Sequence, residues 1–201
     1  MTSPQPEKVP TLNIANVLTV VRVLLVPLFV WLLLLDAGEN GVARWMAVLA
    51  FAVAIYTDKL DGDIARKRGL ITNFGKIADP IADKLLIGSA LILLSIIDGM
   101  PWWITIVILG RELFITVLRF VVIKYGVIPA SRGGKLKTVL QTAAVLLYLM
   151  PLADLLGGWV EWVALAAMLI AVAVTVITGV DYVVQAVRLH SGARGTNQVQ
   201  R

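Results

Sequence analysis

The sequence has no cysteine and only one histidine among its 201 residues. The absence of cysteine excludes a disulfide framework, a thiolate metal site and a cysteine nucleophile. The single histidine, His190, follows Arg188 near the C-terminus, and we interpret it as a solvated side chain rather than a metal ligand or general base. Charged residues make up only 15% of the chain, so any chemistry depends on a few carboxylates and basic groups.

Apolar residues dominate the rest of the sequence. They make up 59% of the chain, with a mean hydropathy of +0.86, whereas a soluble domain is typically about 45–50% apolar. A spanning helix needs roughly 20 mostly apolar residues, and about six segments meet that length. We expect an all-α integral membrane protein, with one helical domain at 12–190 between a disordered tail at 1–11 and a flexible tail at 191–201. The expected spans are Leu12–Leu35, Val42–Ala65, Ile77–Ile97, Trp102–Tyr125, Leu136–Leu156 and Trp159–Leu189.

Basic and acidic residues alternate from one connecting loop to the next. Lys and Arg concentrate at 67–76, at 124–137 and near the C-terminus, while the other loops are mainly acidic. The positive-inside rule then places both termini and the basic loops in the cytoplasm, and an even number of spans agrees. We therefore expect a bacterial inner or plasma membrane protein. Its net charge of +5 indicates orientation and anionic substrates rather than nucleic acid.

Four aspartates lie at the ends of two of these apolar segments. The two runs are Asp58-Lys-Leu-Asp61-Gly62-Asp-Ile-Ala65-Arg66 and Gly75-Lys-Ile-Ala-Asp79-Pro-Ile-Ala-Asp83. A carboxylate beside hydrocarbon costs several kcal/mol, so such residues usually serve function. Spacings of three and four put each pair on one helix face, and acids this close repel each other unless cations lie between them. Oxygen ligands select Mg²⁺ or Mn²⁺, and two such ions suit phosphoryl chemistry.

Small residues accompany the aspartates. Gly62 and Ala65 remove side-chain bulk, which would let either a ligand or a neighbouring helix approach the backbone. Arg66 could bind a phosphate or extend to the membrane interface. Asp63 breaks the face pattern, and we expect it to face a loop.

All eight positions of this pattern, from Asp58 to Asp83, resemble the full signature of the CDP-alcohol phosphatidyltransferases. The resemblance implies that the four aspartates hold two divalent cations, Mg²⁺ or Mn²⁺, and that Asp83 is also the general base. It implies that an acceptor hydroxyl attacks CDP-diacylglycerol in the bilayer, that CMP leaves, and that the protein is a homodimer. The residues implied to line the CDP site are Gly62, Ala65, Arg66 and Gly75.

A second cluster of basic residues follows in the fourth and fifth segments. Arg111 and Arg119 share one helix face because they are two turns apart. Arg111 lies inside an apolar segment and needs a partner, either Glu112, one of the aspartates or a bound anion. We expect the Glu112 pairing to be weak, because adjacent helical residues do not face each other. Lys135 and Lys137 fit either a second anion site or the positive-inside rule.

Three stretches resemble the phosphatidylglycerophosphate synthase branch of that family. They are Gly110-Arg111-Glu112, Gly134-Lys135-Leu-Lys137-Thr138, and Asn13-Ile-Ala-Asn16-Val-Leu-Thr19-Val-Val-Arg22 with Pro27 after it. This resemblance implies sn-glycerol 3-phosphate as acceptor. Asn16, Thr19 and Arg22 either shape the mouth of the site or act as an interfacial cap and anchor. The implied phosphate ligands are Arg111, Arg119 and Lys135, followed by Lys137, Thr138 and Arg132.

Other functions remain open from the residues alone. A cardiolipin synthase using phosphatidylglycerol, or an inositol-phosphate transferase, would keep the same eight-position signature. A divalent-cation transporter would distribute its acids through the bilayer depth, whereas here they gather at one face beside Gly62, Ala65 and Arg66.

Overall fold

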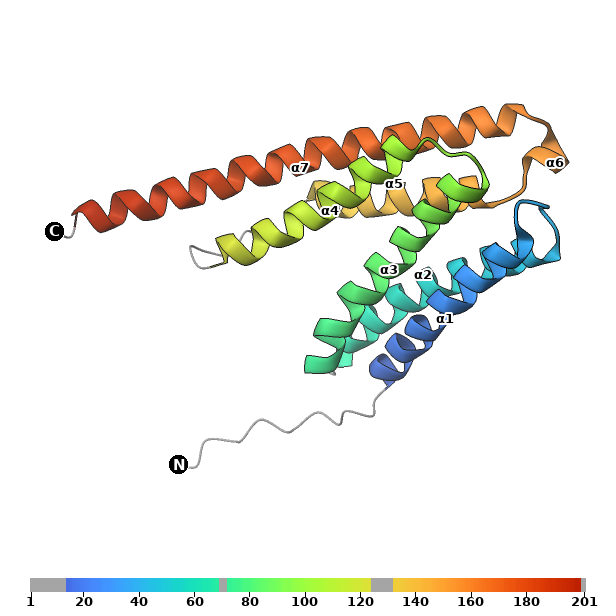
Figure 1. The fold of residues 1–201 in the computed structure, drawn as a ribbon. Helices are drawn as coiled ribbons and strands as arrows, with labels where there is room; N and C mark the ends of the chain where they lie inside the picture. The colour runs from blue at the N-terminus through green and yellow to red at the C-terminus, as the bar shows by residue number, and fades with distance from the viewer. Residues whose placement is uncertain (1–13, 69–71, 124–131, 200–201) are drawn as a thin grey trace. The chain divides into compact units, whose positions relative to one another are not determined.

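The computed structural model describes residues 14–68, 72–123 and 132–199 (Figure 1). A few side chains within these ranges are not described, including those of Ala65, Arg66, Arg132 and Lys135. Helices are the only regular structure in the described ranges, which confirms the all-α prediction. They are α1 (Ile14–Asp36), α2 (Val42–Arg68), α3 (Asn73–Ile97), α4 (Trp102–Val122), α5 (Arg132–Leu149), α6 (Ala153–Leu156) and α7 (Trp159–Val199).

The six predicted segments correspond to the six long helices, with one correction. The fifth segment was predicted as one helix to Leu156, but α5 ends at Leu149 and the short α6 follows Pro151. Proline cannot donate a backbone hydrogen bond, which explains the break. At the C-terminus, α7 continues to Val199, across most of the segment expected to be a flexible tail. The expected tail at 1–11 lies outside the described residues.

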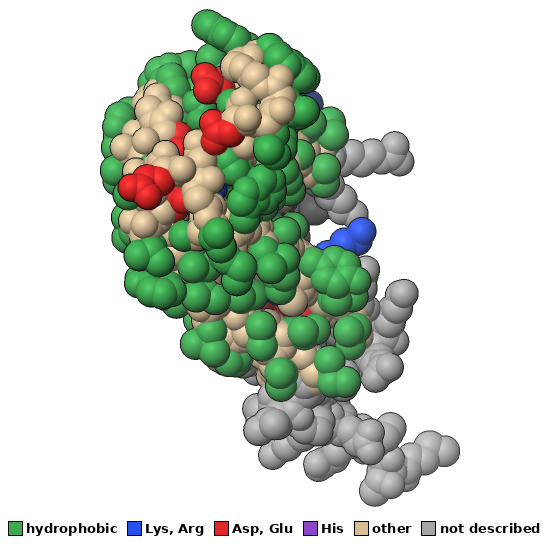
Figure 2. Space-filling model, turned by 90° about the vertical axis from the view of Figure 1, so that its right-hand side faces the viewer, with side chains coloured by type: hydrophobic (Ala, Val, Ile, Leu, Met, Phe, Trp, Pro, Cys, Tyr) green, Lys and Arg blue, Asp and Glu red, His purple; other side chains and the backbone are tan. Residues whose placement is uncertain are grey.

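Several helices have the dimensions of membrane spans. In the described ranges, three are long and apolar enough to cross a bilayer: Asn16–Asp36, Ala78–Ile97 and Trp159–Leu189. A shorter apolar helix covers Leu136–Leu149. Figure 2 shows that hydrophobic side chains cover most of the face that it displays. Exposing so much apolar surface is unfavourable in water and favourable in lipid. The chain is therefore an integral membrane protein.

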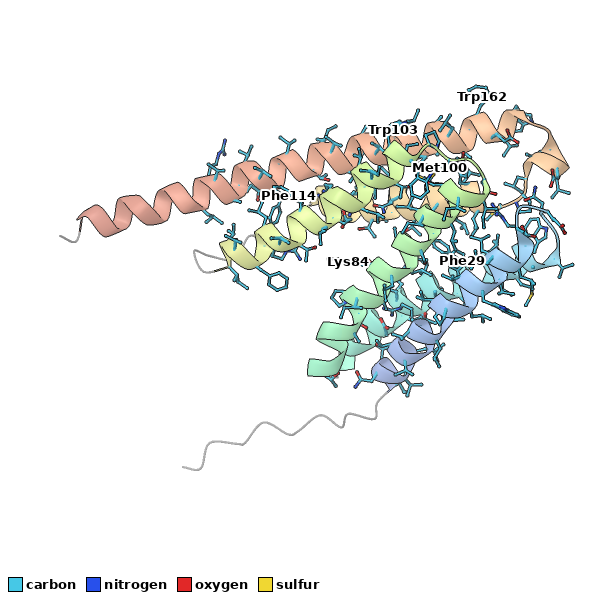
Figure 3. All side chains as sticks on the ribbon, in the orientation of Figure 1. Phe29, Lys84, Met100, Trp103, Phe114 and Trp162 are labelled. Atoms are coloured by element: carbon cyan, nitrogen blue, oxygen red, sulfur yellow. The ribbon has the colours of Figure 1, made fainter. Side chains whose placement is uncertain are left out.

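The chain forms two compact units. The first contains α1, α2 and α3 up to Leu93, together with Leu149–Pro151. Within it α1 and α2 pack against each other. Phe29 of α1 (Figure 3) is buried there, and its ring centroid lies 5.5 Å from that of the buried Phe51 of α2. This packing sets α1 beside the helix that carries Asp58 and Asp61.

The second unit runs from Leu94 to Tyr148 and resumes at Leu152. Its helices α4 and α7 pack side by side and run in the same direction (Figure 1), as expected for two helices separated by one returning span. Trp103 and Trp162 are exposed near the beginnings of these two helices (Figure 3), where aromatic interface anchors are typical. Arg111 and Arg119 therefore lie on a helix that packs along α7.

Candidate active site

Arg22 of α1 lies among three of the predicted aspartates. Its Nη1 is 2.7 Å from Asp58 Oδ1 and 3.7 Å from Asp79 Oδ1, and its Nη2 pairs with Asp61. The Arg22 side chain is 1% exposed, whereas those of Asp58 and Asp79 are 47% and 39% exposed. Carboxylates from α2 and α3 thus converge on the buried guanidinium group of Arg22. The side chains of Asp58 and Asp79 remain partly exposed.

Asn16, Thr19 and Arg22 occupy every third position of α1 and are all buried. Thr19 Oγ1 donates to Asp79 Oδ1 at 2.8 Å. Asn16 Oδ1 accepts from Thr72 Oγ1 at 2.7 Å. The α1 residues therefore face the aspartate cluster, so the alternative in which they are an interfacial cap and anchor does not fit their burial.

Two of the predicted nucleotide residues, Gly62 and Gly75, lie beside members of the aspartate cluster. Gly75 is buried, and a Cβ added there would lie 3.5 Å from Asn16 Oδ1, Thr72 Oγ1 and Asp79 Oδ2. Gly62 directly follows Asp61 and is half-buried. Ala65 and Arg66 belong to α2, but their side chains lie outside the described residues. Gly62 and Gly75 therefore leave the backbone uncovered by side chains next to Asp61 and Asp79.

Two further aspartates lie on the same two helices, α2 and α3. Asp83 is half-buried and follows Asp79 by four residues on α3, a spacing that puts both on one face. Asp63 belongs to α2, and its side chain lies outside the described residues, so its expected orientation toward a loop stays a prediction.

The aspartates of this cluster offer carboxylate oxygens to a metal ion. Among the described side chains, no three carboxylates or imidazoles are arranged to hold a metal directly. Asp58, Asp61 and Asp79 meet instead at the Arg22 guanidinium. The chemistry of the donors still suits a hard divalent cation, because every ligand atom offered by these aspartates is oxygen. The ligand atoms are therefore of the type that Mg²⁺ or Mn²⁺ prefers, while the described side chains do not surround a metal position in this arrangement.

A second charged cluster lies in the other unit. Glu112 Oε1 accepts from Arg111 Nη1 at 2.9 Å and from Lys137 Nζ at 2.6 Å. The prediction of a weak Arg111–Glu112 pairing was therefore wrong. The spacing rule describes the directions of the Cβ atoms, whereas these long side chains bend toward each other. Lys137 of α5 contacts the same Glu112 oxygen as Arg111 does.

The other basic candidates are distributed over α4 and α5. The guanidinium carbon of Arg119 lies 5.7 Å from the centroid of the Tyr182 ring on α7. Thr138 is exposed, and its hydroxyl donates to the Gly134 carbonyl oxygen at 3.2 Å. Lys135 and Arg132 belong to α5, with side chains outside the described residues. The described contacts therefore bring Arg111 and Lys137 together through Glu112.

Helix α7 contributes residues that the sequence analysis missed. Arg111 Nε donates to the Thr175 carbonyl oxygen, and Arg111 Nη2 donates to Thr178 Oγ1, each at 3.1 Å. Gly179 lies directly against the same side chain. These three positions are small or polar residues at helical spacing within a long apolar segment, which is the signal that could have revealed them.

Comparison with known proteins identifies the family. The model for CDP-alcohol phosphatidyltransferase matches residues 12–186, which include both charged clusters. This chain belongs to that family. A CDP-alcohol phosphatidyltransferase of Mycobacterium tuberculosis, named probable phosphatidylglycerophosphate synthase, is 50% identical over 184 residues, covering 92% of this chain and 86% of the relative.

Two other members of the CDP-alcohol phosphatidyltransferase family are named CDP-diacylglycerol–glycerol-3-phosphate 3-phosphatidyltransferase. The one from Bacillus subtilis is 37% identical over 183 residues, covering 85% of this chain and 93% of its own length. The one from Rickettsia typhi is 36% identical over 178 residues, covering 85% and 94%. The similarity thus extends over nearly the whole length of each relative.

Proposed function

We propose that this CDP-alcohol phosphatidyltransferase transfers a phosphatidyl group from CDP-diacylglycerol to sn-glycerol 3-phosphate, giving phosphatidylglycerophosphate and CMP. The observation that carries the proposal is the convergence of Asp58, Asp61 and Asp79 on the buried guanidinium group of Arg22, in a chain whose family signature is complete. The reaction is the one for which the relatives from Bacillus subtilis and Rickettsia typhi are named.

The proposed donor site is the aspartate cluster of the first unit. We propose that Asp58, Asp61, Asp79 and Asp83 hold two divalent cations, Mg²⁺ or Mn²⁺. Such ions, when bound, would neutralise the diphosphate and the charge that develops on departing CMP. The exposure of Asp58 and Asp79 supports access for a ligand.

The protein residues supply binding and proton transfer. Gly62, Ala65 and Gly75 leave room for the CDP group beside the carboxylates, and Arg66 binds its phosphates. Asp83 accepts the proton of the acceptor hydroxyl as that oxygen attacks the phosphorus bonded to the lipid, and the P–O bond to CMP breaks. Its half-buried position suits a base that must contact substrate while being shielded from bulk water.

The proposed acceptor site is the basic cluster of the second unit. We propose that Arg111, Arg119 and Lys135 bind the phosphate of sn-glycerol 3-phosphate, assisted by Lys137, Thr138 and Arg132. Arg111 and Lys137 carry two positive charges against the single negative charge of Glu112, so the cluster keeps a net attraction for an anion. A bidentate arginine contact suits a phosphate group.

We also propose a topology. Both termini and the active site face the cytoplasm of a bacterial cell, in the inner or plasma membrane, because the basic loops follow the positive-inside rule. This side would admit the water-soluble sn-glycerol 3-phosphate. The lipid donor enters from the bilayer. A homodimer is proposed from the family resemblance.

The decisive test is release of labelled CMP from CDP-diacylglycerol by the purified protein in detergent micelles. Glycerol 3-phosphate, phosphatidylglycerol, inositol 1-phosphate and buffer alone are compared as acceptors, and the lipid product is identified. Release that depends on glycerol 3-phosphate supports the proposal. Release only with phosphatidylglycerol or inositol phosphate would replace the acceptor, and divalent-cation flux into vesicles without CMP release would indicate a transporter.

A further inference from the structure

Arg111 is oriented by a second helix as well as by its own. Its Nε donates to the Thr175 carbonyl oxygen and its Nη2 to Thr178 Oγ1, both on α7, while Nη1 donates to Glu112. The side chain is 16% exposed. Three acceptors in different directions fix the plane of a guanidinium group, so α7 determines where the charge of Arg111 points.

The Arg111 side chain packs closely against Gly179. A Cβ at Gly179 would lie 3.1 Å from Nε and 3.2 Å from Cγ of Arg111. Both distances are shorter than ordinary van der Waals contacts between such atoms, which are about 3.5–4.0 Å. A glycine in the middle of a helix is unfavourable compared with alanine, so helix stability does not explain the residue, whereas contact with Arg111 does.

The three hydrogen bonds leave part of the guanidinium available. The group has five N–H donors, and the contacts to Thr175, Thr178 and Glu112 use one on each nitrogen. One N–H on each terminal nitrogen remains as a donor for an anion such as a phosphate.

We propose that Gly179 and Thr178 of α7 are positioning residues for the acceptor, because they align the Arg111 guanidinium with the acceptor's phosphate. The proposal rests on the proposed function, in which Arg111 binds that phosphate. It extends the acceptor site from α4 and α5 to the last helix.

The principal test is Gly179→Ala, with steady-state kinetics measured separately for the two substrates. The added methyl group displaces Arg111, so the KM for glycerol 3-phosphate rises about fivefold, as expected for a weakened charged hydrogen bond. The kcat and the KM for CDP-diacylglycerol stay the same. Alanine favours the helix more than glycine does, so the melting temperature of the variant does not fall.

Gly110→Ala is the matched control. Gly110 precedes Arg111 on α4, and an added Cβ there would meet nothing within 4 Å. The same glycine-to-alanine change therefore leaves the KM for glycerol 3-phosphate unaltered. Thr178→Val removes the acceptor for Nη2 and raises this KM in the same direction as Gly179→Ala, whereas Thr178→Ser keeps the hydroxyl and restores the wild-type value.

Arg111→Ala separates failure of the inference from failure of the proposed function. If Arg111→Ala does not raise the KM for glycerol 3-phosphate selectively, the proposed acceptor site is wrong and the inference falls with it. If Arg111→Ala does so but Gly179→Ala and Thr178→Val leave that KM unchanged, only the positioning role is overturned. Equal increases in both KM values for Gly179→Ala would also overturn it, since they indicate a general structural effect.

Discussion

Thr19 of α1 donates a hydrogen bond of 2.8 Å to Asp79 of α3, although the two residues are 60 positions apart in the sequence. The same hydroxyl lies 3.5 Å from Asp61 Oδ2 on α2. One buried threonine therefore touches an aspartate on each of the two helices that carry the family signature. The first helix thereby becomes part of the candidate active site, and its polar residues contact the carboxylates.

Thr19→Val tests this orientation. The substitution keeps the shape of the side chain and removes the hydroxyl that holds Asp79, and loss of such an outer partner typically weakens metal affinity or activity roughly 10-fold or more. We expect weaker Mn²⁺ binding by calorimetry and lower turnover. Thr57→Val is the control, because the Thr57 hydroxyl is buried in the same unit but donates to the Ala54 carbonyl oxygen of its own helix. Equal losses in both variants would contradict the role of Thr19.

Arg22→Ala tests the internal counterion of the aspartates. Removing one partner of a buried ion pair typically costs about 3–5 kcal/mol, because the remaining charges lose their compensation. We expect a lower melting temperature in EDTA and a larger stabilisation by Mn²⁺ than in the wild type, because the cation then replaces the guanidinium.

Arg44→Ala provides the comparison for Arg22. Arg44 is also a buried arginine, but it lies near the start of α2 and donates to the Leu149 carbonyl oxygen at 2.7 Å. Its loss lowers stability without making the protein more responsive to Mn²⁺. If Mn²⁺ stabilises the two variants equally, Arg22 is not the counterion of the metal site.

Asp83→Asn tests the proposed general base. The amide cannot take a proton from the acceptor hydroxyl, and loss of general-base catalysis costs roughly 10²–10⁴-fold in rate. We expect CMP release to fall by that order while the melting temperature stays close to the wild-type value. Asp154→Asn, at an exposed position on α6, retains full activity. Near-normal turnover by Asp83→Asn would require another base.

Removal of divalent cations tests the proposed metal dependence. EDTA treatment is expected to abolish CMP release, since the aspartates then lack the ions that would neutralise the diphosphate. Added Mg²⁺ or Mn²⁺ restores it, and the saturating concentration of each ion gives its affinity. Full turnover in excess EDTA would rule out the metal-assisted route.

Tyr182→Leu tests whether α7 also influences Arg119. Arg119 lies 5.7 Å from the Tyr182 ring centroid, and an exposed cation–π contact contributes about 0.5–1 kcal/mol. We expect the KM for glycerol 3-phosphate to rise about two- to fivefold, with Tyr182→Phe close to wild type because the ring is retained. An equal change in the KM for CDP-diacylglycerol would speak against a specific effect on the acceptor.

The sequence alone predicts the helices well, because the length of an apolar segment is a local property. Val42, Trp102 and Trp159 begin helices at the predicted positions, and Ile97 ends one. The exception, the break after Leu149, had a local signal in Pro151 that the continuous apolar character obscured.

The partners of the charged residues were less predictable. Asp58, Asp61, Asp79 and Asp83 could be recognised from their spacing, but the positions of Arg22 and Thr19 among them depend on how α1 is rotated against α2 and α3. The shared contact of Glu112 with Arg111 and Lys137 depends on how these side chains bend and on how far α5 is shifted along its axis relative to α4. Helical periodicity in the sequence gives information on neither.

The sequence by itself therefore determined that this protein consists of membrane helices with an acidic signature and a basic cluster, since composition and spacing within one helix are sufficient for both. Only the tertiary structure decided that Arg22 compensates the aspartates and that Thr178 and Gly179 hold Arg111. The physical reason is that a charge buried between helices takes the nearest partner in space, and packing of the helices decides which residue that is.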